Sequence, residues 1–157
     1  ICWGLQVAVT AAGGEVKKGK NGAHRGIAHE IVINPDGLKH LLYKDKKQTF
    51  NTPAFNYDEV VALPKDSILL SSNKVNRVMG VNFKTEVSDI WGIQYHPEIT
   101  YEKMVTLIKF RKERLLQNKS FSNEEDMTSH IQIIEDEIKI SDKDNRMREL
   151  RNWLNFI

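Results

Sequence analysis

The sequence predicts a mixed α/β domain over residues 1–100, followed by an all-helical segment over residues 101–157. Two observations support this division. Up to about residue 100, one helical pattern precedes several short apolar runs that are separated by turn residues, which is typical of strands. After Thr100, apolar residues recur with the spacing of amphipathic helices.

Residues 4–12 (GLQVAVTAA) predict the first helix. Their apolar members follow the i, i+3, i+4, i+7 spacing of one helical face: Leu5, Ala8, Val9 and Ala12. Gly13 and Gly14 come next, as glycine does just past the end of a helix. We expect the following residues, to about Ala23, to form a polar loop.

Five short runs predict strands, because turn residues separate them. They are residues 27–33, 60–63, 67–71, 77–83 and 90–95. The sequence NPDG after the first run (34–37) predicts a turn, and the charged run 44–48 is expected to be a solvated loop. Pro97 cannot donate to a strand ladder, so the last strand should end at His96.

Three amphipathic helices are expected after residue 100. They cover residues 101–117, 122–140 and 144–156. Ser122 followed by Glu125 predicts a capping box at the start of the second helix. The third helix carries Trp153, Leu154 and Phe156, and we expect this apolar group to pack back on the α/β part rather than to dock a partner subunit.

Composition excludes several classes of function. The net charge of +2 and the absence of a basic stripe with aromatics argue against nucleic-acid binding. No apolar run approaches the length of a membrane span. A single cysteine forms no internal disulfide, so a reducing, cytoplasmic setting is expected. The histidines lack the spacing of a zinc site, and we expect neither a metal nor another cofactor.

The only cysteine, Cys2, directly precedes the first predicted helix. A helix N-terminus supplies partial positive charge and free N–H groups, which stabilise a thiolate nucleophile. Gly4 leaves space for a sharp turn, so Cys-x-Gly matches the second half of a Gly-x-nucleophile-x-Gly elbow. The alternative is a small buried core residue, which is the commoner role of a lone cysteine.

His96 follows the last apolar run, and Glu98 lies two residues further on. The carboxyl ends of strands are where open α/β sheets place their ligands. A carboxylate at this distance can accept a hydrogen bond from the imidazole and fix its tautomer, as in nucleophile–histidine pairs. The alternative is a surface His-Pro turn with a solvated glutamate.

Taken together, the motifs CWGLQ (2–6) and GIQYHPE (92–98) resemble those of the class I glutamine amidotransferase family, in particular domains of the GMP-synthase type. The resemblance covers about residues 1–100. It implies a partial doubly wound, flavodoxin-like α/β domain, of which residues 1–100 form the C-terminal part and residues 101–157 a helical extension. Only Ile1 precedes the cysteine, so we expect an N-terminally truncated piece of a longer protein, with little activity by itself.

The resemblance also implies roles for individual residues. Cys2, His96 and Glu98 would form a catalytic triad that hydrolyses glutamine through a γ-glutamyl thioester. The backbone N–H of Trp3 would stabilise the oxyanion, and Gln6 would help to hold the substrate. The ammonia would pass to a synthase or other acceptor subunit.

A looser match places Ala54 and Phe55 as candidate contacts of the glutamine substrate, and packing against the sheet is their alternative role. Two other functions remain open at this point. One is hydrolysis of γ-glutamyl amines by the same cysteine and histidine. The other is an inactive fragment or binding module.

Overall fold

The computed structural model describes all residues 1–157. Its main sheet has five strands in the order β4-β3-β7-β8-β9. These strands are β3 (Ala28–Ile33), β4 (Thr49–Thr52), β7 (Ile68–Ser72), β8 (Gly80–Lys84) and β9 (Asp89–Ile93). Two short ribbons pair β1 (Glu15–Lys18) with β6 (Asp58–Ala62) and β2 (His24–Arg25) with β5 (Phe55–Asn56). All of these strand pairs are antiparallel.

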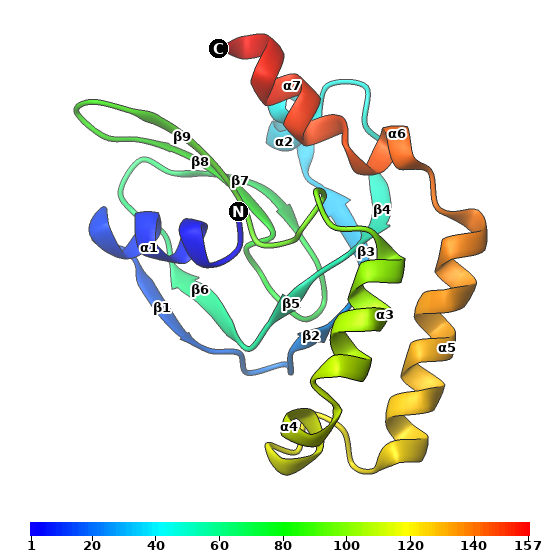
Figure 1. The fold of residues 1–157 in the computed structure, drawn as a ribbon. Coiled ribbons are helices and arrows are strands. Elements are labelled where there is room, and N and C mark those ends of the chain that lie inside the picture. Colours follow the sequence, from blue (N-terminus) through cyan, green and yellow to red (C-terminus); the bar gives the residue numbers. More distant parts are fainter.

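The helices lie on different sides of this sheet (Figure 1). They are α1 (Trp3–Ala11), α2 (Pro35–Lys39), the 3-10 turn η1 (Leu41–Tyr43), α3 (Tyr101–Phe110), α4 (Lys112–Gln117), α5 (Glu124–Ile140), α6 (Lys143–Arg146) and α7 (Arg148–Phe156). Helix α1 lies beside β6, whereas α3 and α5 run side by side on the opposite side of the molecule. Helix α7 returns from α5 and packs on η1.

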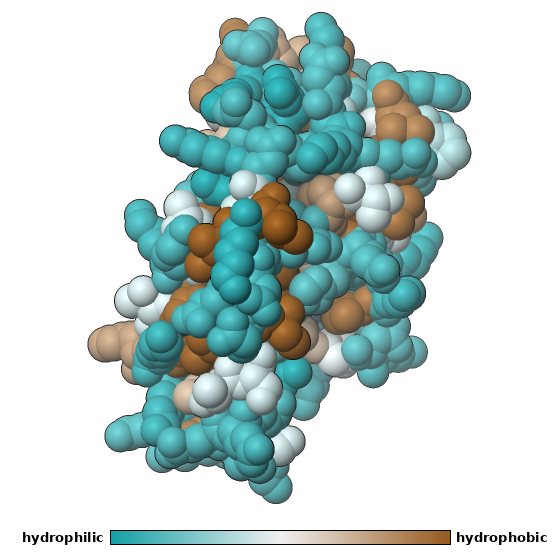
Figure 2. Space-filling view, turned by 90° about the vertical axis from the view of Figure 1, so that its right-hand side faces the viewer, coloured by the Kyte–Doolittle hydropathy of each residue, from teal (hydrophilic) through white to brown (hydrophobic).

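Three apolar clusters hold these layers together. Leu5 and Val9 of α1 pack with Val60, Val81 and Phe83 from the sheet side. A second cluster fills the space between the main sheet and the 3-10 turn. A third joins α3, α4 and α5 around the following buried residues: Ile27, Tyr101, Val105, Ile108, Leu115, Phe121, Met127, Ile131 and Ile134. The outward face of α5 is mostly hydrophilic, as its amphipathic pattern predicts (Figure 2).

The predicted mixed α/β class and the C-terminal helices are confirmed, and the predicted strands occur with small shifts of their ends. The predicted loop before residue 23 contains β1, which pairs with β6. The predicted turn at 34–37 is instead the start of α2: the Asn34 side chain accepts from the N–H of Gly37 and Pro35 occupies the first helical position. Both features favour a helix start.

The helical segment differs from the prediction at three points. The helix over 101–117 is broken at Arg111 into α3 and α4, and Leu115 still reaches the same core. Asn123, not Ser122, caps α5, because its side chain accepts from the N–H of Asp126 while the Asp126 carboxylate accepts from the N–H of Ser122. The third predicted helix is split at Met147 into α6 and α7.

The apolar end of α7 packs back only in part. The Phe156 ring lies on Trp91, with ring centroids 4.5 Å apart. Trp153, Leu154 and Phe156 nevertheless remain 43%, 60% and 52% exposed. None of the helices is both long and apolar enough to cross a membrane.

Candidate active site

Cys2 lies at the turn that leads into α1. Its backbone has φ 49° and ψ −112°, in the left-handed region that side chains other than glycine rarely adopt. The N–H of Cys2 donates to the carbonyl of Ile93 at 2.7 Å, which ties the turn to the end of β9. The next N–H, that of Trp3, is one of the first in α1 and has no intrahelical acceptor. The Trp3 side chain itself is 75% exposed.

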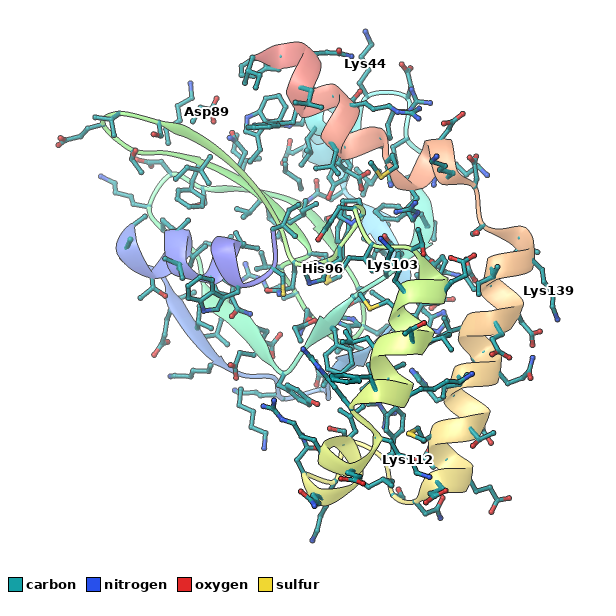
Figure 3. All side chains as sticks on the ribbon, viewed as in Figure 1. Lys44, Asp89, His96, Lys103, Lys112 and Lys139 are labelled. Carbon is teal, nitrogen blue, oxygen red and sulfur yellow. The ribbon has the colours of Figure 1, made fainter.

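His96 and Glu98 lie in the turn after β9. The N–H of His96 donates to Pro53 O at 2.8 Å, and the N–H of Ile99 closes the turn onto His96 O at 3.2 Å. Nδ1 of His96 lies 2.7 Å from Oε1 of Glu98, so the predicted contact between them is present. The His96 ring lies near the middle of the molecule, between α1 and α3 (Figure 3).

The surroundings favour a protonated His96. Burial lowers the pKa of His96, but the Cys2 thiol and the Glu98 carboxylate more than offset this and raise it to about 9. Burial opposes ionisation of Glu98, yet its hydrogen bond with His96 holds the pKa of that carboxyl below its usual value. An imidazolium between a carboxylate and a thiol is the arrangement that stabilises a thiolate.

Cys2 and His96 are neighbours, but no aligned hydrogen bond joins the sulfur to the imidazole. Sγ of Cys2 points to Phe55 O at 3.8 Å, and Nε2 of Gln94 donates to Sγ at 3.5 Å. Catalytic contacts of this kind are often loose before substrate binds. The fold therefore brings Cys2, His96 and Glu98 to one place.

Gln94 is a site residue that sequence reasoning did not select. It is fully buried and links two predicted site residues, because its Oε1 accepts from Nε2 of Gln6 at 3.2 Å while its own Nε2 reaches Cys2. Gln6 also donates to Asp58 O at 3.0 Å. The signal was in the sequence: Gln94 belongs to the GIQYHPE motif and lies two residues before His96.

The segment 53–55 passes directly over the site. Phe55 O faces the Cys2 sulfur, and Pro53 O holds His96. Ala54 is fully buried and exchanges backbone hydrogen bonds with Gly26. The loose match at Ala54 and Phe55 thus falls beside the thiol, and their contact with substrate stays a prediction. The structure contains no cluster of three or more metal-ligating side chains.

These features define an α/β protein with a cysteine at a helix N-terminus beside a histidine–carboxylate pair. The profile of the family described as Glutamine amidotransferase class-I matches residues 1–113. The chain therefore belongs to the class I glutamine amidotransferase family.

Curated relatives fall into two functional groups. A gamma-glutamyl-L-1-hydroxyisopropylamide hydrolase from a Pseudomonas species is 33% identical over 103 residues, which cover 64% of this chain and 35% of that protein. A glutamine-hydrolyzing GMP synthase subunit from Methanosarcina acetivorans is 32% identical over 103 residues, which cover 66% of this chain and 51% of that protein. The chain thus spans about a third to a half of these relatives.

Solved structures share the fold across nearly the whole chain. A glutamine amidotransferase from Thermotoga maritima superposes with a TM-score of 0.71 at 19% identity, covering 98% of this chain and 60% of that one. A glutamine amido transferase from Methylobacillus flagellatus gives a TM-score of 0.61 at 14% identity, covering 96% of this chain and 61% of that one. These superpositions include the C-terminal helices.

Proposed function

We propose that this chain carries the nucleophile and the general acid–base pair of a glutaminase site, which converts glutamine to glutamate and ammonia. The observation that carries the proposal is the His96–Glu98 contact of 2.7 Å beside Cys2, in a chain of this family. Glu98 occupies Nδ1, which leaves Nε2 of His96 to exchange a proton with the sulfur. Glu98 thus orients the imidazole and stabilises its protonated form.

The reaction runs in two halves. His96 takes the thiol proton, and the Cys2 thiolate attacks the side-chain carbonyl carbon of glutamine. The C–N bond breaks as His96 returns the proton to the leaving nitrogen, which releases ammonia and leaves a γ-glutamyl thioester. His96 then accepts a proton from water as the hydroxide attacks the thioester carbonyl carbon. The C–S bond breaks, His96 returns its proton to the sulfur, and glutamate leaves with the Cys2 thiol regenerated.

Two further residues take supporting roles in this proposal. The free N–H of Trp3 at the start of α1 would donate to the carbonyl oxygen, on which negative charge develops, and loss of one such donor costs about a hundredfold or more in rate. Gln6 lies one helical turn beyond Cys2 and would contact the substrate once its amide exchanges its present bonds to Asp58 and Gln94.

A second candidate function is hydrolysis of γ-glutamyl amines other than glutamine. The relative from Pseudomonas, named as a hydrolase of a γ-glutamyl amide, favours it. The same thioester chemistry serves both functions, because only the leaving amine differs. Comparing glutamate release from glutamine with release from γ-glutamyl alkylamides decides between them. For the glutaminase, we further propose that the ammonia passes to a synthase partner, by analogy with the GMP synthase relatives.

The test of the nucleophile is covalent labelling. A diazoketone analogue of glutamine should add its side chain to Cys2, detected by peptide mass spectrometry, and glutamate release should vanish in Cys2→Ser. His96→Gln should slow the labelling strongly because the thiolate loses its counterion. Turnover that persists in Cys2→Ser overturns the assignment of Cys2 as the nucleophile. Cys2 that stays unmodified by the analogue, with no glutamate release from the wild type, favours an inactive binding module.

A further inference from the structure

We propose that Arg146, on the C-terminal helix α6, is a positioning residue for the active site: it holds the turn 96–99 so that Glu98 stays against His96. This inference rests on the proposed function. It assigns a role in the site to the helical segment after residue 113, which the family profile does not cover.

The contacts of Arg146 go to the backbone on both sides of Glu98. Its Nη1 donates to the carbonyl of Pro97 and, at 2.9 Å, to the carbonyl of Ile99. Pro97 is buried, and no other donor to its carbonyl is present. One guanidinium nitrogen therefore fixes the orientation of two peptide groups, and the Glu98 side chain projects from the residue between them.

The charge state of Arg146 makes these contacts unusual. The residue is only 9% exposed, and no carboxylate lies within ion-pair distance of its guanidinium. Removing a cation from water without a counterion is costly, so its donors must be well used. Here Nη1 donates to two backbone carbonyls of the turn and also lies 3.6 Å from Sδ of Met147. Hydrogen bonds from a charged donor are stronger than neutral ones.

Helix α7 provides a rigid base for Arg146. Glu149 is fully buried three residues further on, where its carboxylate accepts from the hydroxyl of Tyr95 and pairs with Nζ of Lys46 at 2.8 Å. Tyr95 immediately precedes His96. The helical segment thus contacts the chain on both sides of His96. Glu149 binds the hydroxyl of Tyr95 just before it, and Arg146 binds the turn just after it.

The position of the Glu98 carboxylate therefore depends on Arg146 as well as on the turn 96–99. The Glu98 side chain is 40% exposed, and the turn itself is closed by one backbone bond of 3.2 Å, from Ile99 to His96. Without the two bonds from Arg146, the peptide groups around Glu98 are free to rotate and the carboxylate leaves the imidazole. Misplacement of a supporting group by about 1 Å can cost about a hundredfold in rate.

The experiment compares four proteins: wild type, Arg146→Met, Glu98→Gln and the double variant. Arg146→Met keeps the apolar stem and removes the donors. Three quantities are measured. They are the steady-state kcat and KM for glutamine, or for the γ-glutamyl amide that the wild type prefers, and the protonation midpoint of His96 by NMR. The chain has five histidines, so the His96 signal is assigned by its absence in His96→Gln.

We expect Arg146→Met to lower kcat about tenfold to a hundredfold, with KM within about threefold, because positioning and not binding is lost. The His96 midpoint should fall, since the favourable carboxylate moves away. Loss of the Arg146 charge alone would raise the midpoint, so the sign separates the two causes. In the Glu98→Gln background, Arg146→Met should cause no further loss of kcat and no further fall of the His96 midpoint.

A raised or unchanged His96 midpoint, or losses that add in the double variant, overturns the proposal. Arg151→Met is the matched control, because Arg151 pairs with the exposed Asp144 and does not touch the turn; its kcat should equal that of the wild type. If Arg146→Met does not fold, Arg146→Lys replaces it. An ammonium cannot reproduce the planar donor, so a smaller fall of the midpoint is expected, and no fall contradicts the proposal.

The NMR measurement of the His96 midpoint tests this inference independently of the proposed function. If no γ-glutamyl substrate is turned over and the diazoketone analogue leaves Cys2 unmodified, the glutaminase assignment fails. The His96 midpoint still reports whether Arg146 holds Glu98 in place.

Discussion

Lys46 and Glu149 form an ion pair in which both side chains are fully buried, with Nζ and Oε2 2.8 Å apart. The two residues are 103 positions apart in the chain. Burial lowers the pKa of Lys46 and raises the pKa of Glu149, so each charge depends on the other. The expectation that the charged run 44–48 is a solvated loop is therefore wrong at Lys46. This residue is buried and pairs with Glu149 of α7.

Removing one partner of this pair should strongly destabilise the fold. Glu149→Ala leaves the Lys46 charge buried without a counterion, and we expect the free energy of unfolding in urea to fall by about 3–5 kcal/mol. The double variant Lys46→Met with Glu149→Leu should lose less than Glu149→Ala alone, because no charge remains buried. Costs that simply add would show that the two residues do not depend on each other.

The Glu98 carboxylate should set the titration of His96. The pKa of His96 is raised from 6.5 to about 9, so the stability that this interaction contributes is fully present below about pH 6.5 and is lost as the pH rises through 9. Glu98→Gln should lower the His96 midpoint measured by NMR. It should also reduce the loss of stability between about pH 6 and about pH 10, measured by urea unfolding. An unchanged midpoint would contradict the role given to Glu98.

The backbone at Cys2 should be strained. With φ at 49°, the backbone of Cys2 has a conformation that only glycine adopts without steric strain. Cys2→Gly and Cys2→Ala both remove the thiol, so their difference reports the backbone alone. We expect the glycine variant to be more stable in urea by about 1 kcal/mol. The reverse order would show that the turn is relaxed.

Gly92 should be needed for the close approach of α1 to β9. A Cβ at Gly92 would lie 2.3 Å from Cδ1 of Leu5, so Gly92→Ala pushes α1, and with it Cys2, away from the strand. We expect a loss of about 1–3 kcal/mol of stability in urea. Combining Gly92→Ala with Leu5→Ala should cost less than the sum of the single variants. Full additivity would place the strain elsewhere.

Much of the candidate site was predictable because its motifs are local. Cys2 lies directly before a helix, and His96 and Glu98 share one turn, so residue order alone suggests each half of the site. Gln94 was within reach of the same reasoning. The capping of α5 was misplaced by one residue, because Ser122 and Asn123 are both good caps and only the backbone path chooses between them.

The sequence by itself determined the mixed α/β class, the helical segment and the residue types of the site, because periodicity and short motifs are encoded in neighbouring residues. The tertiary structure alone decided that Gln94 links Cys2 to Gln6, that Lys46 is buried and that Arg146 reaches Pro97 and Ile99. These contacts join residues up to about a hundred positions apart. A charged residue is solvated or buried according to its distant partners, and no local pattern encodes them.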